Sequence, residues 1–206
     1  MKLYFSPLAC SMASRIALYE CRAEVDYLEV DTRAKRVADG RDFLQVNPLG
    51  MVPVLETDEG ELLTENAAIL QLIAERHPQA RLAPRDPLGR ARLQQLLSFI
   101  GTELHKATYL PLLDKAAPAA MKEHARAGAG LRLAWMAARL EGRDQLLDEL
   151  SVADTYLFTV LNWSSVTHVD LDPWPALVAF MQRMRARPSV ARALEEETAL
   201  YARRSR

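Results

Sequence analysis

The chain has 206 residues, of which 50% are hydrophobic and 26% are charged, proportions typical of a globular protein. Its formal net charge of −1 removes the electrostatic argument for binding nucleic acid or a membrane surface. No apolar run approaches the length of a membrane span, and Pro7 breaks the N-terminal apolar stretch too early for a signal peptide.

Strand and helix patterns alternate in the first part of the chain. The predicted elements are a strand at residues 3–5, a helix at 11–21, a strand at 25–30, a hairpin of strands at 52–56 and 61–63, and a helix at 65–75. The first strand–helix–strand unit makes its two strands parallel neighbours. Residues 32–46 show no clear pattern, so the predicted order is β-α-β-(α)-β-β-α.

Prolines divide the chain into two parts. Pro78, Pro84 and Pro87 predict a stiff linker at residues 79–87, between a first domain at 1–78 and an all-helical domain at 88–206. The helices predicted in the second domain lie at residues 88–113, 121–140, 152–166, 173–187 and 189–201.

The helix predicted at residues 152–166 is expected to be the buried centre of the second domain, because its residues are apolar on most faces. Ser151 precedes it as the N-cap residue, and Asp154 is an acid at the third helical position, which makes the pair a near relative of the capping box. We expect this cap to stabilise the helix by about 1 kcal/mol.

The two cysteines, Cys10 and Cys21, are expected to be free thiols. If both lie on one helix, they are roughly 16 Å apart, whereas a disulfide needs Cα atoms within roughly 7 Å. Free thiols suit a reducing cytoplasm, which is where we expect this protein.

Three separate segments predict a site for a small thiol peptide. Pro53 cannot donate a ladder hydrogen bond, so the backbone at Val52 and Pro53 is available beside the start of a strand. Glu65 and Asn66 open a helix whose first N–H groups can bind a negatively charged ligand group. Cys10 adds a thiol at the start of another helix.

Five short motifs resemble those of the cytosolic glutathione transferases, and most of all the bacterial beta class. They are residues 2–5 with 9–11, residues 47–53, residues 63–65, residues 102–106 and residues 151–158. The resemblance covers the whole chain. It implies an α/β plus all-α fold, with an N-terminal thioredoxin-like βαβ-ββα domain and a C-terminal helical bundle, in a two-fold homodimer.

The resemblance also implies that glutathione is the co-substrate, with no other cofactor. The glutathione-binding residues it implies are Ala9, Cys10, Lys35, Met51, Val52, Pro53, Glu65, Asn66, Ser98, Thr102 and His105. Glu65 would bind the γ-glutamyl ammonium, while Asn66 and its helix N-terminus would bind the γ-glutamyl carboxylate. Val52 would pair with the cysteinyl part as an added strand does, and Lys35 would bind the glycyl carboxylate.

Cys10 is the first candidate for catalysis. A helix start lowers the pKa of a thiol from about 8.5 toward neutrality, and the thiolate can attack or share a disulfide. The thiol can also donate a hydrogen bond to the glutathione thiolate. Two alternatives stay open, since Cys10 could be a small buried hydrophobe and Ser11 could activate the sulfur or merely cap the helix. Cys21 is expected in the core.

His105 is the second catalytic candidate, because the resemblance implies that it faces the sulfur across the cleft between the domains. A neutral imidazole there could act as an acid, a base or a polar wall. The alternative is an ordinary core or surface histidine. His77, His124 and His168 have no partners at metal-ligand spacing, so we predict no metal site.

Some residues depart from the beta-class pattern. Leu8 stands where Gly is common, Met51 where Gln is common, Asn66 where Ser or Gly is usual, and Ser98 where an Asn often helps the neighbouring subunit's site. Residues 142–150 lack the Gly usual just before the capping Ser. These departures bear on glutathione affinity and substrate range more than on the fold.

The leading hypothesis is a detoxifying glutathione transferase that conjugates reduced glutathione to hydrophobic electrophiles, with possible thiol–disulfide exchange through Cys10. Residues 110–113 and Trp163 are candidates for the apolar second-substrate pocket. The alternatives are a glutathione-dependent peroxidase, dehalogenase or disulfide reductase, or a non-catalytic glutathione-binding protein, because one fold supports several functions.

Overall fold

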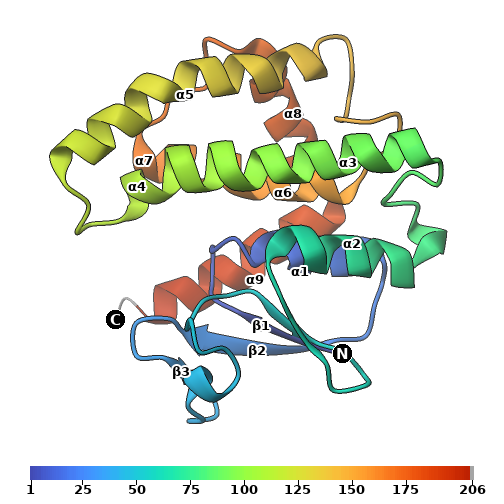
Figure 1. Ribbon diagram of the computed structural model, residues 1–206, viewed down its shortest axis with the longest axis vertical. Helices are drawn as coiled ribbons and strands as arrows, with labels where there is room; N and C mark the ends of the chain where they lie inside the picture. Colours follow the sequence, from blue (N-terminus) through green and yellow to red (C-terminus); the bar gives the residue numbers. More distant parts are fainter. Residues whose placement is uncertain (205–206) are drawn as a thin grey trace. The chain divides into compact units, whose positions relative to one another are not determined.

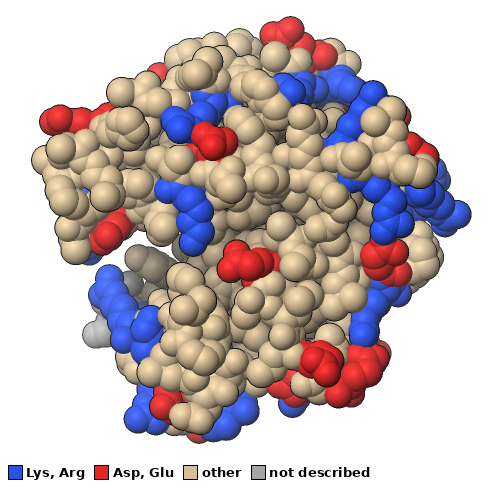
Figure 2. All heavy atoms as spheres, in the orientation of Figure 1, with Lys and Arg blue, Asp and Glu red and all other residues tan. Residues whose placement is uncertain are grey.

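The computed structural model describes residues 1–204 and divides into two compact units (Figure 1). The first unit contains Met1–Ala80 and the chain that begins at Pro188, and the second contains Arg81–Arg187. On the face drawn in Figure 2, basic and acidic side chains are interspersed among uncharged ones. No helix within the described residues is long and apolar enough to cross a lipid bilayer.

The first unit is built on a five-stranded mixed sheet. Its strands are β1 (Lys2–Phe5), β2 (Asp26–Asp31), β3 (Arg36–Val37), β4 (Val54–Glu56) and β5 (Leu62–Thr64), in the spatial order β3-β2-β1-β4-β5. Strand β1 runs parallel to β2, with Leu3 opposite Tyr27, and antiparallel to β4, with Leu3 opposite Leu55. The predicted βαβ unit and the hairpin of β4 and β5 are therefore confirmed.

The stretch at residues 32–46, which gave no clear pattern, contains the short strand β3 and a 3₁₀ turn, η1 (Phe43–Gln45). Asp42 caps this turn by accepting the Leu44 N–H. Phe43 is buried and packs in one core cluster with Tyr4 and Val37 of the sheet. The segment is ordered by this aromatic anchor rather than by a repeating pattern of its own.

Helices cover the sheet of the first unit (Figure 1). They are α1 (Met12–Glu20), α2 (Asn66–Arg76), the 3₁₀ turn η2 (Pro78–Ala80) and α9 (Pro188–Arg204). Helix α1 packs against both α2 and α9. Because it lies between its neighbours, α1 is buried over most of its length, from Met12 to Leu18.

Helix α9 belongs with the sheet, whereas the sequence assigned residues 88–206 to the helical domain. Ion pairs and packing join α9 to elements far away in the sequence. Arg204 donates to Glu29 at 2.6 Å and to the Val30 carbonyl at 2.8 Å on strand β2. Glu196 pairs with Arg15 of α1. Val190 and Ala193 of α9 are also fully buried, so the helix completes the first unit.

The second unit is helical throughout its described elements. They are α3 (Pro87–Phe99), η3 (Ile100–Tyr109), α4 (Leu110–Leu113), α5 (Ala119–Leu140), α6 (Val152–Leu161), α7 (Ser164–Thr167) and α8 (Pro175–Arg185). The helix predicted at residues 88–113 is continuous in space, but η3 at its centre is wound as a π-helix. The helix predicted at 152–166 ends at Leu161, and all ten residues of α6 are buried, as expected of a central helix.

The start of α6 is tied down by one buried carboxylate. Asp154 accepts the backbone N–H and the hydroxyl of Ser151, each at 2.8 Å. Its other oxygen accepts the Leu146 N–H at 2.8 Å, so the loop before the helix is bound to the same group. Three buried hydrogen-bond donors therefore have the Asp154 carboxylate as their acceptor.

We expect Asp154→Ala to lower the free energy of unfolding by about 3 kcal/mol, because it removes a cap and leaves buried donors unpaired. Urea unfolding followed by circular dichroism measures the loss. Asp148→Ala is the matched control, because this carboxylate in the same loop is 96% exposed and pairs only with a surface arginine. Equal losses in the two variants would contradict the role given to Asp154.

Candidate functional site

Cys10 lies in the tight turn that leads from β1 into α1. The turn is closed by Ala9, whose N–H donates to the Ser6 carbonyl at 3.1 Å, and by Ala13, whose N–H donates to the Cys10 carbonyl at 3.2 Å. The thiol is half-buried and forms no disulfide. Its Sγ donates to the Val52 carbonyl at 3.3 Å, which places the thiol at the start of α1 and beside the loop before β4.

The loop that carries Val52 is shaped by its own side chains. Asn47 is buried, and its amide donates to the Met51 carbonyl at 2.8 Å. The Val52–Pro53 peptide bond is cis. Pro53 is buried, Val52 is half-buried and Met51 is exposed. Strand β4 begins only at Val54, two residues after the start of the strand predicted at 52–56, so the main chain at Val52 lies outside the ladder.

Glu65 and Asn66 differ from one another in what they offer a ligand. Glu65 is exposed, has a φ of +67° that is rare for a residue with a side chain, and forms no capping bond. Such a backbone persists only where the surrounding structure holds it, and it is common at ligand sites. Asn66 is buried, and its amide donates to the Cys10 carbonyl at 2.8 Å and accepts from the Ser14 hydroxyl at 2.9 Å.

The side chain of Asn66 is therefore occupied inside the first unit, which differs from the ligand contact that the sequence suggested for it. The groups that the start of α2 can offer a ligand are therefore backbone N–H groups. The first intrahelical bond is donated by Ala68 to Glu65, so the N–H groups of Asn66 and Ala67 precede it and are free for an anion.

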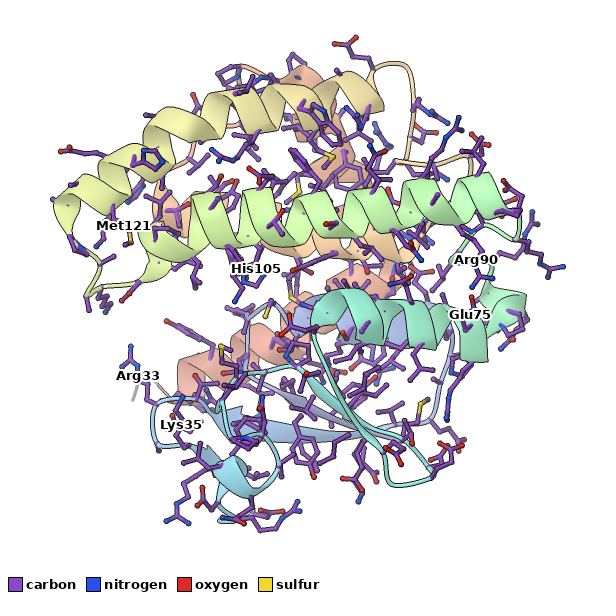
Figure 3. The ribbon with its side chains drawn as sticks, viewed as in Figure 1. Arg33, Lys35, Glu75, Arg90, His105 and Met121 are labelled. Atoms are coloured by element: carbon purple, nitrogen blue, oxygen red, sulfur yellow. The ribbon has the colours of Figure 1, made fainter. Side chains whose placement is uncertain are left out.

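Lys35 lies against the same loop (Figure 3). Its ammonium donates to the Gly50 carbonyl at 3.0 Å. A side chain at Gly50 would collide with it, since a Cβ there would approach the Lys35 Cδ to 2.7 Å. The structure thus brings Cys10, Val52 and Asn66 into direct contact and places Lys35 on the neighbouring Gly50.

Ser11 lies on the inside of the turn before α1. It is fully buried, its hydroxyl donates to the Ser6 carbonyl at 3.2 Å, and it accepts the Ser6 N–H at 3.2 Å. Both contacts fix the turn before α1. Cys21 is buried as expected, and burial raises the pKa of its thiol to about 12, so that it stays protonated and unreactive.

A carboxylate near the end of the chain holds the turn before Cys10, and sequence reasoning missed it. Glu197 of α9 is fully buried and accepts the Leu8 N–H at 2.6 Å. Leu8 has a φ of +60°, the left-handed region in which Gly is unstrained. This explains the Gly usual at the position, and the hydrogen bond offsets the strain. Glu197 follows two other glutamates, and nothing in that run singles it out.

In the helical unit, the predicted site residues lie on one helical stretch. Ser98 and Thr102 are exposed, and the Thr102 hydroxyl donates to the Ser98 carbonyl at 3.0 Å. His105 projects from η3 (Figure 3), and its Nδ1 lies 2.9 Å from the Tyr156 hydroxyl. Burial, with a smaller effect of the Lys106 charge, lowers the pKa of His105 to about 4, so the imidazole is neutral at pH 7.

Aromatic side chains pack against His105, and exposed leucines follow it along the same helical stretch. The ring of Trp163 lies 5.0 Å from the His105 ring and 6.2 Å from the Tyr109 ring. Leu110 and Leu113 of α4 are exposed. The apolar residues predicted for the second substrate therefore belong to the helical unit, as expected. Within residues 1–204, no three His, Cys, Asp or Glu side chains are grouped so that they could hold a metal ion.

Family models match both units. The model described as "Glutathione S-transferase, N-terminal domain" matches residues 1–75, and the C-terminal domain model matches residues 94–188. The chain belongs to the glutathione S-transferase family. The glutathione S-transferase GstA of Escherichia coli O157:H7 is 39% identical, over 96% of this chain and 98% of that protein.

Solved glutathione transferases also resemble the chain. The bacterial beta-class enzyme of Sphingomonas chungbukensis is 44% identical with a TM-score of 0.91, covering 96% of this chain and 98% of that one. A sphingomonad glutathione S-transferase complexed with glutathione is 42% identical with a TM-score of 0.91, covering 96% and 99%. The resemblance seen in the sequence motifs is confirmed.

The carboxylate of Glu197 makes the stability of this glutathione transferase depend on pH. Burial raises the pKa of Glu197 to about 7 from its ordinary 4.5, and the Leu8 N–H and Arg15 offset only part of that rise. The folded protein therefore holds a proton that the unfolded chain releases. The stability that Glu197 contributes is complete below its ordinary pKa of 4.5 and is lost as the pH rises through about 7.

We expect wild type to lose roughly 2 to 3 kcal/mol of unfolding free energy relative to Glu197→Gln between pH 5 and pH 8. Urea unfolding at each pH unit measures this difference. Glu195→Gln, an exposed neighbour on α9, should leave the pH dependence of wild type unchanged. A difference between wild type and Glu197→Gln that is constant with pH would show that Glu197 does not titrate in this range.

Proposed function

We propose that this glutathione transferase conjugates reduced glutathione to hydrophobic electrophiles and that Cys10 acts on the glutathione sulfur. The observation that carries the proposal is the contact between the Cys10 Sγ and the Val52 carbonyl at 3.3 Å. A peptide that pairs with the main chain of Val52 through its cysteinyl residue has its own sulfur close to Cys10. The start of α1 then favours a thiolate on the bound peptide, and the Cys10 thiol, which is a donor in this structure, can donate to it.

The surroundings of Cys10 match the charges of glutathione. The exposed carboxylate of Glu65 suits the γ-glutamyl ammonium. The first N–H groups of α2 suit the neighbouring γ-glutamyl carboxylate. The ammonium of Lys35, beside Gly50, suits the glycyl carboxylate at the other end. Asn66 contributes indirectly, because it holds the Cys10 carbonyl in place.

The proposed chemistry begins with an ionised sulfur. The glutathione thiolate attacks an electrophilic carbon, a carbon–sulfur bond forms, and the electron pair leaves with the departing group or is taken up by the electrophile, which then gains a proton. In thiol–disulfide exchange, the Cys10 thiolate attacks oxidised glutathione, a mixed disulfide forms, and glutathione leaves as a thiolate. Peroxidase, dehalogenase and reductase reactions would start from the same bound sulfur.

The first test is the intact mass of the protein after incubation with oxidised glutathione, before and after a reductant. We expect one reversible glutathionyl adduct, mapped to Cys10, because Cys10 is half-buried while the Cys21 thiol is buried and protonated. Cys10→Ala should abolish the adduct, and Cys21→Ala should keep it. Conjugation of a generic electrophile should also fall in Cys10→Ala.

An adduct confined to Cys21, or full conjugating activity in Cys10→Ala, would exclude the proposed role of Cys10. Binding of glutathione without any turnover would favour a non-catalytic binding protein on this fold.

We also propose that the protein is a two-fold homodimer in the cytoplasm, where it serves detoxification. Large apolar side chains on helices of the second unit support association, since Leu88 of α3 is 61% exposed and Leu131 of α5 is 82% exposed. Homo-oligomers of soluble proteins are most often two-fold dimers.

Light scattering on the eluting protein tests the dimer. We expect twice the chain mass of 23.1 kDa, which is about 46 kDa. Leu131→Glu should shift the population toward the monomer, because it places a charge in an apolar contact. Leu44→Glu, at an exposed leucine of the first unit, serves as the control for added charge. A mass of one chain for the unaltered protein would refute the dimer.

A further inference from the structure

His105 is held by a buried phenol for which the proposed chemistry has no direct use. The Tyr156 hydroxyl lies 2.9 Å from the His105 Nδ1. The two residues are only 4% and 8% exposed. Tyr156 comes from the central helix α6 and His105 from η3, so the hydrogen bond joins two elements of the same unit.

The packing around this pair leaves the imidazole little freedom. The His105 and Tyr156 rings meet edge to face, with an interplanar angle of 88°, and Trp163 packs against the His105 ring at 5.0 Å. The phenol lies close to the backbone of η3, since a Cβ at Gly101 would be in ordinary van der Waals contact with the Tyr156 oxygen, at 3.5 Å.

The π-helical geometry of η3 helps to place the His105 side chain. The Leu110 N–H donates to the His105 carbonyl, five residues back, and the Thr108 hydroxyl donates to the Glu103 carbonyl at 2.8 Å. A π-helical turn of this kind shifts side chains relative to an ordinary helix and is frequent at functional sites.

The direction of the hydrogen bond follows from the chemistry of its two atoms. An unprotonated imidazole nitrogen is a far stronger base than a phenol oxygen, and a phenol is a good O–H donor. The stronger arrangement therefore has Tyr156 donating to the Nδ1 of His105. A neutral imidazole has a single N–H, so its proton then resides on Nε2. Burial keeps the ring neutral at pH 7, because it lowers the pKa of His105 to about 4.

We propose that Tyr156 is a positioning residue that fixes the proton of His105 on Nε2, so that His105 acts as a neutral hydrogen-bond donor to the electrophile. The inference rests on the proposed transferase function. Of the roles considered for His105 from the sequence, which were an acid, a base and a polar wall, it favours a proton-bearing group over a base. A general base needs an unprotonated nitrogen facing the reactants, and this arrangement uses that nitrogen to accept from Tyr156.

The donor would act as the thiolate adds to the electrophile. The carbon–sulfur bond forms, and an electron pair moves onto an oxygen or nitrogen of the electrophile, where the Nε2–H stabilises the negative charge. The pair then expels the leaving group or takes a proton from water. Electrophiles that develop charge on such an atom, for example α,β-unsaturated carbonyl compounds or nitroaromatic halides, are the favoured substrate class.

Nitrogen NMR of histidine-labelled protein at pH 7 tests the tautomer directly, because protonated and unprotonated ring nitrogens have well-separated shifts. We expect the His105 signals to show a protonated Nε2 and an unprotonated Nδ1, with His105→Gln used to assign them. In Tyr156→Phe the preference for Nε2–H should be lost. Tyr109→Phe is the matched control, since that buried phenol pairs with Ser164 at 2.7 Å.

Steady-state kinetics of the same variants provide a second test of the role of Tyr156. We expect Tyr156→Phe to lower kcat for a nitroaromatic halide about 10-fold, less than the roughly 10²- to 10³-fold loss expected when a transition-state donor is removed. KM for glutathione should stay within about twofold, because Glu65 and Lys35, the charged groups proposed to bind its ends, lie in the first unit. Tyr109→Phe should change neither constant.

A wild-type spectrum with the proton on Nδ1 would overturn the proposal, as would an unchanged His105 spectrum in Tyr156→Phe. The wild-type spectrum decides the tautomer even if a variant does not fold. A protein with the Nε2–H tautomer but no conjugating activity would refute the proposed function while leaving the positioning by Tyr156 in place, so the two failures are distinguishable.

Discussion

The buried carboxylate of Glu197 is the constraint on which the candidate site depends. Taking a carboxylate out of water is costly, and its ionic partner Arg15 stays 3.6 Å away, so the pair is a weak source of stability. Its effect is geometric. The same carboxylate accepts the Leu8 N–H and so holds the strained residue that precedes Cys10. A group near the end of the chain thus defines the backbone path at its beginning.

Two further contacts complete this support, so that the turn before α1 is held from three directions. Ser11 pairs with Ser6 on the inside of the turn, and Asn66 reaches from α2 to the Cys10 carbonyl. Two departures from the beta-class pattern gain a physical meaning here. Leu8 introduces strain that a hydrogen bond offsets, and Asn66 replaces a small residue with one that braces the thiol. Both changes alter how the site is built and leave its main-chain donors in place.

Local patterns predicted much of the fold, and long-range pairing explains the rest. Apolar periodicity indicated the strand–helix–strand unit, the hairpin and the buried helix after Ser151, and the motifs indicated Cys10 and the loop at Val52. The attachment of α9 could not be read from the sequence, because the match between Arg204 and Glu29 exists only in the folded chain. The same is true of the partners of Asn66 and His105. The π-helical winding of η3 leaves no distinct signature in sequence periodicity.

The position of α9 has a consequence for the order in which the protein can form during synthesis. The first unit is discontinuous, and the helical unit is inserted between its two segments. Domains generally fold as units while the chain emerges. When the first 80 residues leave the ribosome, Arg15 has none of its carboxylate partners, and the turn before Cys10 lacks the acceptor for Leu8. All residues of the helical unit emerge before α9 does. The helical unit can therefore fold before the first unit is complete. The thiol site is then assembled last, after α9 has emerged.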